Sequence, residues 1–275
     1  MTDVLNTPPI FTPKIIFFDI DDTLCREGKL APQNKATLEA LAAQTDIKLA
    51  IATGRSKSLI PDDILELLDR QVFDAIVCTN GQYNFTKQGL ISHYPLTLAQ
   101  AEKIDALCQQ DHLMHKFDSD RHLAWATDNE KIRASLPDYP SAIIDPDYYK
   151  TNTVYQCSVF FSHNADRMQD VDFAKKGLKL VYWHHVGGDI LPIEASKARG
   201  VSDVCHYFDI DIKQAMAIGD GFNDIEMFKA VGFSVAMGDS EPELIQVADF
   251  VTGTIEDKGI QKVLHPLLPN LSQQT

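Results

Sequence analysis

Five short, continuous apolar segments recur along the chain, and they constrain its fold more than any other feature. They read KIIFFD (14–19), IKLAIA (47–52), AIVC (75–78), AMAI (215–218) and FSVA (233–236). Strands buried on both faces of a parallel sheet have this uninterrupted apolar character. Apolar residues three and four positions apart indicate helices between them, at 34–43, 58–68 and 222–231. The alternation of strand and helix predicts an α/β fold with a doubly wound parallel sheet.

The middle of the chain breaks this alternation. The dipeptide Asn80-Gly81 is expected to be a turn at a hinge, with contact to a ligand as the alternative. After it we expect a hairpin, several further strands, and helices at 98–110 and 165–176. A second glycine pair, Gly187-Gly188, precedes the apolar run 190–193, which could return to the first sheet. We therefore predict a core domain of residues 1–82 and 188–275, with an α+β domain inserted at 83–187.

Composition limits the kinds of partner. The chain has 275 residues, 44% of them hydrophobic, and a formal net charge of −14. This charge argues against sequence-independent binding of nucleic acid, whose affinity comes from neutralised phosphates. No apolar run reaches membrane-spanning length, and the first residues do not read as a signal peptide. We therefore expect a cytoplasmic protein that binds neither nucleic acid nor membranes, while its oligomeric state stays unpredicted.

The first polar motif, DIDDTL at 19–24, follows the first apolar run directly. Ligands of open α/β sheets bind beyond the carboxyl ends of the strands, so these acids lie where a ligand would. Alternation points Asp19 and Asp21 broadly the same way. Two carboxylates about 4 Å apart repel by roughly 4 kcal/mol at an effective dielectric of about 20, so a cation or a shared proton is expected. Helix capping would explain one or two of these acids, but not the acid on the strand as well.

A second acidic motif, GDGFND at 219–224, follows the AMAI segment. Asp220 ends the predicted strand, and Asp224 is reachable from the first turn of the next helix. Alone, the motif could be a turn with a capping acid. Together with the first motif it predicts a cation site, because oxygen ligands without His or Cys suit a hard cation such as Mg²⁺.

Groups that suit an anion lie elsewhere in the sequence. The tripeptide Thr53-Gly54-Arg55 follows the second apolar run, and its hydroxyl and backbone N–H suit phosphate oxygens. Arg55 either reaches the substrate or forms a surface salt bridge. A lysine at a helix start is ordinarily solvated, but the acid cluster needs a positive charge nearby, which makes Lys197 a candidate.

In chain order these motifs are D-x-D-x-T, T-G-R, K-x-x-G and G-D-G-x-N-D. That order resembles the haloacid dehalogenase superfamily of phosphohydrolases, and the resemblance covers nearly the whole chain. The insertion between the second and third motifs is similar to the Cof-type branch, whose large α/β cap closes over the site and selects the substrate. The sequence departs from the most frequent pattern at Asp22, where the family usually has Gly.

The resemblance implies roles for the acids. Asp19 would be the nucleophile that takes the phosphoryl group, and Asp21 the general acid and then the general base. Mg²⁺ would be held by the Asp19 carboxylate, the Asp21 main-chain carbonyl and Asp220. Asp224 would orient metal-bound waters or Lys197, and Thr23 would likewise support the metal ligands without binding the metal itself.

The resemblance also implies the groups that hold the phosphoryl oxygens, which are Thr53, Gly54, Lys197 and Asn223. The predicted function is a Mg²⁺-dependent phosphatase for a small phosphorylated metabolite such as a sugar phosphate. A phosphomutase or phosphotransferase on the same scaffold, or a non-catalytic protein that binds a phosphorylated ligand, remains an alternative. A signalling receiver domain is disfavoured because such modules are shorter and carry no insertion. A dehalogenase is disfavoured because its chemistry needs neither Asp21 nor a metal cluster.

Overall fold

The protein is described here from a computed structural model, which covers residues 11–161, 168–184 and 187–269. Its larger sheet has eight strands in the order β16-β15-β14-β1-β4-β5-β6-β7. Their bounds are β1 (Ile15–Phe18), β4 (Lys48–Ala52), β5 (Ala75–Cys78), β6 (Tyr83–Thr86), β7 (Gly89–His93), β14 (Ala215–Gly219), β15 (Phe233–Ala236) and β16 (Phe250–Val251). The five predicted apolar runs form five neighbouring parallel strands, which confirms the fold class.

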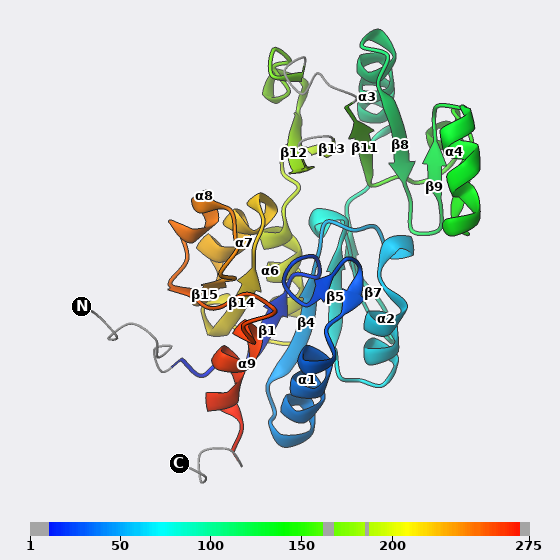
Figure 1. Cartoon of the computed structure of the whole chain (residues 1–275). Helices are drawn as coiled ribbons and strands as arrows, with labels where there is room; N and C mark the ends of the chain where they lie inside the picture. Colours follow the sequence, from blue (N-terminus) through cyan, green and yellow to red (C-terminus); the bar gives the residue numbers. More distant parts are fainter. Residues whose placement is uncertain (1–10, 162–167, 185–186, 270–275) are drawn as a thin grey trace.

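Helices cover both faces of this sheet (Figure 1). Their bounds are α1 (Pro32–Gln44), α2 (Asp62–Asp69), α6 (Lys197–Tyr207), α7 (Ile225–Ala230), α8 (Pro242–Ile245) and α9 (Gly259–Leu264). On β1, Ile16 and Phe18 belong to an apolar cluster with α1, α2 and α9, whereas Ile15 and Phe17 belong to a second cluster with α6, α7 and α8. Successive strand residues point to opposite faces, so a strand buried on both sides must be apolar at every position. Each such side chain contributes about 1.5–3 kcal/mol on burial, which fixes β1 and the acid that follows it.

A second sheet of six strands forms a cap beyond the first sheet (Figure 1), in the order β10-β9-β8-β11-β13-β12. Its strands are β8 (Met114–Asp118), β9 (Leu123–Trp125), β10 (Ala142–Ile144), β11 (Gln156–Phe160), β12 (Leu178–His184) and β13 (Gly187–Pro192), and its helices are α3 (Leu98–Gln110), α4 (Glu130–Ser135) and α5 (Tyr148–Thr151). Helices α3 and α5 pack on one face in a third apolar cluster. The helix expected at 98–110 is confirmed, and Thr97 and Gln100 cap its start reciprocally.

Cross-strand register places polar residues together on the opposite face of the cap sheet. Lys116 of β8 pairs with Ser158 of β11, Asp118 with Gln156, and Ser158 in turn with Asp189 of β13. All five side chains are buried. Buried polar groups on a sheet face need hydrogen-bond partners, so this face must meet other polar groups.

Two segments lie in a different sheet from the one expected. The hairpin β6–β7 was predicted within the insertion, but it pairs antiparallel with β5 and extends the core sheet. The run 190–193 was expected to return to the core sheet, yet β13 pairs with β11 and β12 in the cap. The strands of each sheet therefore do not match the predicted domain limits at 83 and 187: β6 and β7 lie in the core sheet, and β13 lies in the cap sheet. The reason is that an apolar run does not specify which of two sheets buries it. The tight turn at Asn80-Gly81 sends the chain back beside β5 instead of into the cap.

Three smaller points complete the fold. Part of the helix expected at 165–176 lies outside the described residues, and the described rest, 168–176, contains no α-helix but a 3-10 turn at Ala174–Lys176. A short hairpin of β2 (Cys25–Arg26) and β3 (Lys29–Leu30) follows the first acidic motif. Within the described part of the chain, no helix is both long enough and apolar enough to cross a bilayer.

Candidate active site

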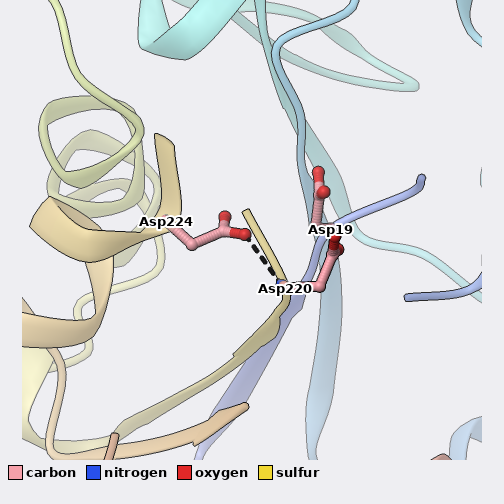
Figure 2. Close-up of side chains that lie close together, drawn as sticks. All are labelled: Asp19, Asp220 and Asp224. Atoms are coloured by element: carbon pink, nitrogen blue, oxygen red, sulfur yellow. Dashed lines mark hydrogen bonds between the residues drawn. The ribbon is translucent and has the colours of Figure 1, made fainter. Parts of the chain in front are cut away.

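The polar motifs meet at the carboxyl edge of the core sheet. Strand β1 lies between β4 and β14, and all three are parallel. Asp19 follows β1, Thr53 follows β4 and Asp220 follows β14, so the three residues leave the sheet at the same edge. Figure 2 shows the side chains of Asp19 and Asp220 at neighbouring strand ends, with Asp224 reaching toward them from the adjoining turn.

Lys197 links two of these acids. Its Nζ donates to Asp19 Oδ1 at 2.8 Å and to Asp224 Oδ1 at 2.7 Å, and its side chain is fully buried. Burial alone would lower the pKa of Lys197, but the charges of Asp19 and Asp224 raise it above its ordinary value. The lysine is therefore a permanent cation inside the site, as the acidic cluster requires.

Glycines set the position of this lysine. Lys197 is the first residue of α6, whose start Ser196 caps through its side chain. A Cβ on Gly200, one turn further on, would lie 2.5 Å from Val77 Cγ1 and 2.9 Å from Gly81 Cα. A Cβ on Gly81 would lie 2.0 Å from the carbonyl oxygen of Ser196. Helix α6 thus rests directly on the backbone of the turn that follows β5.

The acid cluster carries more negative charge than Lys197 offsets. One oxygen each from Asp19, Asp220 and Asp224 lie within 4.8 Å of one another. Burial raises the pKa of Asp19 to about 7 against the pull of Lys197, with Asp224 and Asp21 adding repulsion. Burial, then the charges of Asp19 and Asp224, raise the pKa of Asp220 to about 9. A bound cation would remove this repulsion, and the all-oxygen donor set fits a hard divalent ion.

Asp220 and Asp224, the two acids of the fourth motif, differ in how many hydrogen bonds their carboxylate oxygens accept. Asp224 Oδ2 accepts the backbone N–H groups of Asp220 (3.1 Å) and Gly221 (3.0 Å), while its Oδ1 accepts from Lys197. The carboxylate of Asp220 accepts only one hydrogen bond among the described residues, from Thr23 Oγ1 at 2.8 Å. Asp220 and Asp19 are therefore better placed to bind a cation, whereas Asp224 holds the lysine and the loop.

Thr53, Gly54 and Asn223 lie on another side of the site. Thr53 is buried, and its Oγ1 accepts the N–H of Arg55 at 3.1 Å. A Cβ on Gly54 would lie 3.1 Å from Asn223 Nδ2 and 3.2 Å from Asn80 Oδ1. The structure thus brings the second and fourth motifs together, and a side chain at position 54 would crowd both asparagine amides.

The side chain of Asp21 points to a partner outside the acid cluster. Arg55 Nε donates to Asp21 Oδ2 at 2.8 Å and Arg55 Nη2 donates to Oδ1 at 2.7 Å, while Nη1 donates to the Leu59 carbonyl. Arg55 therefore forms an ion pair with an acid of the first motif, which refines the two alternatives left by the sequence. A bidentate contact of this kind fixes the plane of the carboxylate.

Two cap residues of the site were not predicted from the sequence, and Asn80 was predicted as a hinge turn with ligand contact only as the alternative. Asn80 contacts Asn223, and the cap residues Gln156 and Asp189 contact Asn80. For Asn80 the signal was its place at the end of a third parallel strand. For the cap residues no such signal exists, because alternating polar residues in a strand ordinarily face solvent.

Comparisons with known proteins agree with the fold and the motifs. The family of haloacid dehalogenase-like hydrolases matches residues 16–264. The Bacillus subtilis (strain 168) protein named "Putative phosphatase YkrA" is 33% identical over 259 residues, 90% of this chain and 95% of that protein. A phosphoglycolate phosphatase from Archaeoglobus fulgidus is 25% identical, covering 93% and 97%. A crystal structure of a hypothetical protein from Geobacillus kaustophilus HTA426 has a TM-score of 0.76 and 31% identity, covering 93% and 98%.

The chain belongs to the haloacid dehalogenase superfamily, in its Cof-type branch, and is a phosphoric monoester hydrolase. Phosphatases of this family generally use a divalent metal and act on small phosphorylated substrates.

Proposed function

We propose that the chain is a Mg²⁺-dependent phosphatase that hydrolyses small phosphomonoesters, such as sugar phosphates or similar metabolites, through an aspartyl-phosphate on Asp19. The observation that carries the proposal is the buried pair of Asp19 and Lys197, 2.8 Å apart at the end of β1. A lysine in that place favours the ionised form of the nucleophile against the effect of burial, and would lie beside the incoming phosphoryl group.

The metal fits the residues present. The ion would be held by the Asp19 carboxylate, the Asp220 carboxylate and the main-chain carbonyl of Asp21. Thr23 and Asp224 hydrogen-bond to Asp220 and so hold it in place. A Mg²⁺ ion bound there would offset the repulsion between the anionic nucleophile and the anionic phosphate.

The chain's own groups then divide the reaction. An oxygen of Asp19 forms the bond to phosphorus as the ester P–O bond breaks, and the leaving alkoxide takes a proton from Asp21. In the second half, Asp21 takes a proton from water, the water oxygen attacks phosphorus, and Asp19 is released. The Thr53 hydroxyl, the Gly54 N–H, Lys197 and the Asn223 amide would hold the phosphoryl oxygens.

Arg55 supports the second half of this division by holding the Asp21 carboxylate. The bidentate contact stabilises the anionic form of Asp21, which takes the proton from water, whereas the first half requires Asp21 to carry a proton and so to loosen this contact. The same contact keeps the carboxylate in one plane for the water step.

The proposal is tested by phosphate release from a panel of small phosphomonoesters, with added Mg²⁺ or with EDTA. The panel includes sugar phosphates, phosphoglycolate and p-nitrophenyl phosphate. We expect turnover with Mg²⁺ that EDTA abolishes and that restored Mg²⁺ recovers. Folded protein that releases no phosphate from any ester, or that is equally active in EDTA, would contradict the proposal. Formation of an isomeric sugar phosphate without phosphate release would favour the mutase alternative.

A second prediction concerns stability and pH. Asp19 and Asp220 have pKa values raised to about 7 and about 9, so their contribution to stability is complete below about pH 4 and is lost as pH rises through those values. We therefore expect the melting temperature in EDTA to fall between pH 5 and pH 8.

Added Mg²⁺ should raise the melting temperature more at pH 8 than at pH 5, because the metal removes the repulsion between ionised acids. Asp189, whose pKa burial raises to about 7, lies in the cap and should leave a residual fall that Mg²⁺ does not correct. Thermal melts at four pH values, with EDTA or Mg²⁺, measure both effects. Equal stabilisation by Mg²⁺ at all four values would contradict the assignment of the metal to these acids.

A further inference from the structure

Asn80 lies at the point where the cap meets two loops of the core. It follows β5 and is buried, and its backbone is left-handed, with φ 51° and ψ 42°. Asn is one of the few residues other than Gly that readily adopt this conformation. Its N–H donates to the Thr53 carbonyl, and the N–H of Thr79 donates to the Arg55 carbonyl. The Asn80 turn is therefore tied by its backbone to the T-G-R loop.

The side-chain amide of Asn80 has partners on both sides. Its Nδ2 donates to Gln156 Oε1 and to Asp189 Oδ2 in the cap, both at 3.3 Å. Its Oδ1 accepts from Asn223 Nδ2 in the core, at 3.2 Å. Gln156 also donates to the Gly54 carbonyl at 3.3 Å. The Asn80 amide thus connects β11 and β13 of the cap to Asn223 of the fourth motif, beside Gly54 of the second motif.

Asp189 sets the direction of this chain of hydrogen bonds. Its other oxygen, Oδ1, accepts from Ser158 Oγ (2.9 Å) and from Trp183 Nε1 (3.3 Å), and an indole N–H can only donate. With acceptors on the cap side, Asn80 must turn its NH₂ to the cap and its oxygen to the core. Asn223 must then present its NH₂ to Asn80, which leaves the second N–H of that group for another acceptor.

We infer that Asn80 is a positioning residue that transmits closure of the cap to the Asn223 amide, so that the phosphoryl-holding groups are complete only when the cap is down. The inference rests on the proposed function for the role of Asn223. If the cap lifts, Asn80 loses both cap acceptors, and among the described residues its side-chain amide keeps only the contact with Asn223. In a buried polar network each lost partner leaves an unsatisfied group, so the closed arrangement holds the amide in one orientation.

Binding of inorganic phosphate, measured by calorimetry with Mg²⁺ present, tests the inference without requiring turnover. We expect Asn80→Ala to weaken phosphate binding about tenfold, the effect of one hydrogen bond to a charged ligand. Asn223→Ala should have a similar effect. Because Asn80 acts through Asn223, the double variant should bind phosphate no more weakly than Asn223→Ala alone.

The cap side has its own variant and control. Asp189→Asn is close in shape but offers one acceptor oxygen in place of two, so Asn80 or the Ser158–Trp183 pair faces an N–H donor. It should weaken phosphate binding in the wild-type background and have no further effect beside Asn80→Ala. Lys179→Gln removes a different cap–core contact, the exposed ion pair with Glu226 at 3.1 Å, and should leave the affinity within about twofold.

Two results would overturn the inference. Additive losses in Asn80→Ala and Asn223→Ala would mean that Asn80 acts independently of Asn223. An equal loss in Lys179→Gln and Asp189→Asn would mean that any loosening of the cap has the same effect. Circular dichroism and melting curves identify variants that fail to fold, and in that case the wild-type side-chain amide NMR signals of Asn80 and Asn223 decide. Failure of the proposed function appears separately, as wild-type protein that binds phosphate but releases none from esters.

For turnover, the same mechanism predicts that Asn80→Ala lowers kcat by up to about 100-fold on p-nitrophenyl phosphate, with a smaller change in KM, since misplacement far from the chemistry has effects of that size. A merely structural residue would change the melting temperature without this pattern. A loss confined to KM would contradict the positioning role.

Discussion

Replacing Asp19 by Asn is expected to lower phosphatase turnover by at least about a thousandfold, since loss of a nucleophile has effects of this order or larger. The amide keeps the shape of the carboxylate and accepts a hydrogen bond from Lys197, but it cannot form the acyl-phosphate. Phosphate release at saturating Mg²⁺ measures the effect. The exposed Asp46→Asn variant is the matched control and should keep full activity.

The same change is expected to stabilise the metal-free protein at pH 8. An ionised Asp19 lies close to Asp220 and Asp224, and burial, with repulsion from Asp224 and Asp21, raises the pKa of Asp19 to about 7. Removing one charge relieves that repulsion, so the melting temperature in EDTA should rise while activity disappears. Retained activity, or a fall in melting temperature comparable with that of a cavity-forming core substitution, would contradict the assigned role of Asp19.

Replacing Lys197 by Met is expected to abolish turnover and to lower the free energy of unfolding by about 3–5 kcal/mol, the usual effect of removing one partner of a buried ion pair. Met fills similar space without charge, so Asp19 and Asp224 are left buried with no cation between them. Urea denaturation at pH 8 in EDTA measures the loss. Lys131→Met, on the exposed side of α4, should change stability by less than about 0.5 kcal/mol.

A second substitution separates charge from packing. Adding Asp224→Asn to Lys197→Met removes one of the stranded charges, so it should recover part of the stability but none of the turnover. If Lys197→Met alone costs under about 1 kcal/mol, the two contacts behave as surface pairs do and the lysine does not hold the site together.

The positions of the acids could be predicted because two local patterns coincide with a rule about sheets. An apolar run that ends in an acid places Asp19 and Asp220 at strand ends, and parallel strands bring those ends to one edge. The sequence alone does not bring Lys197 to that edge, because 178 positions separate it from Asp19 and a lysine at a helix start is ordinarily solvated. The family resemblance supplied that step, and the structure places the two side chains in contact.

The cap residues of the site could not be predicted from the sequence, for a physical reason. Gln156 and Ser158 alternate with apolar residues in β11, a pattern that indicates a face in water, and Asp189 is a lone acid after two glycines in β13. Only the placement of the cap over the core turns that face into a buried one. The hairpin β6–β7 failed differently, because the turn at Asn80-Gly81 determines where the next strand goes and its apolar pattern suits either sheet.

The contact between α6 and the Gly81 turn has a consequence for how members of this family should be compared. Three residues, a rise of about 4.5 Å along the helix axis, separate Gly200 from Lys197, so the spacing K-x-x-G sets how far the ammonium group lies from the point where α6 meets the backbone at Gly81. Helix α6 contacts the bare backbone at Gly81, and a methyl group at either Gly81 or Gly200 would push the helix away and displace the ammonium group. A relative that keeps every acid and the lysine but has lost either glycine is therefore a candidate for a protein that retains the charges and has lost their alignment.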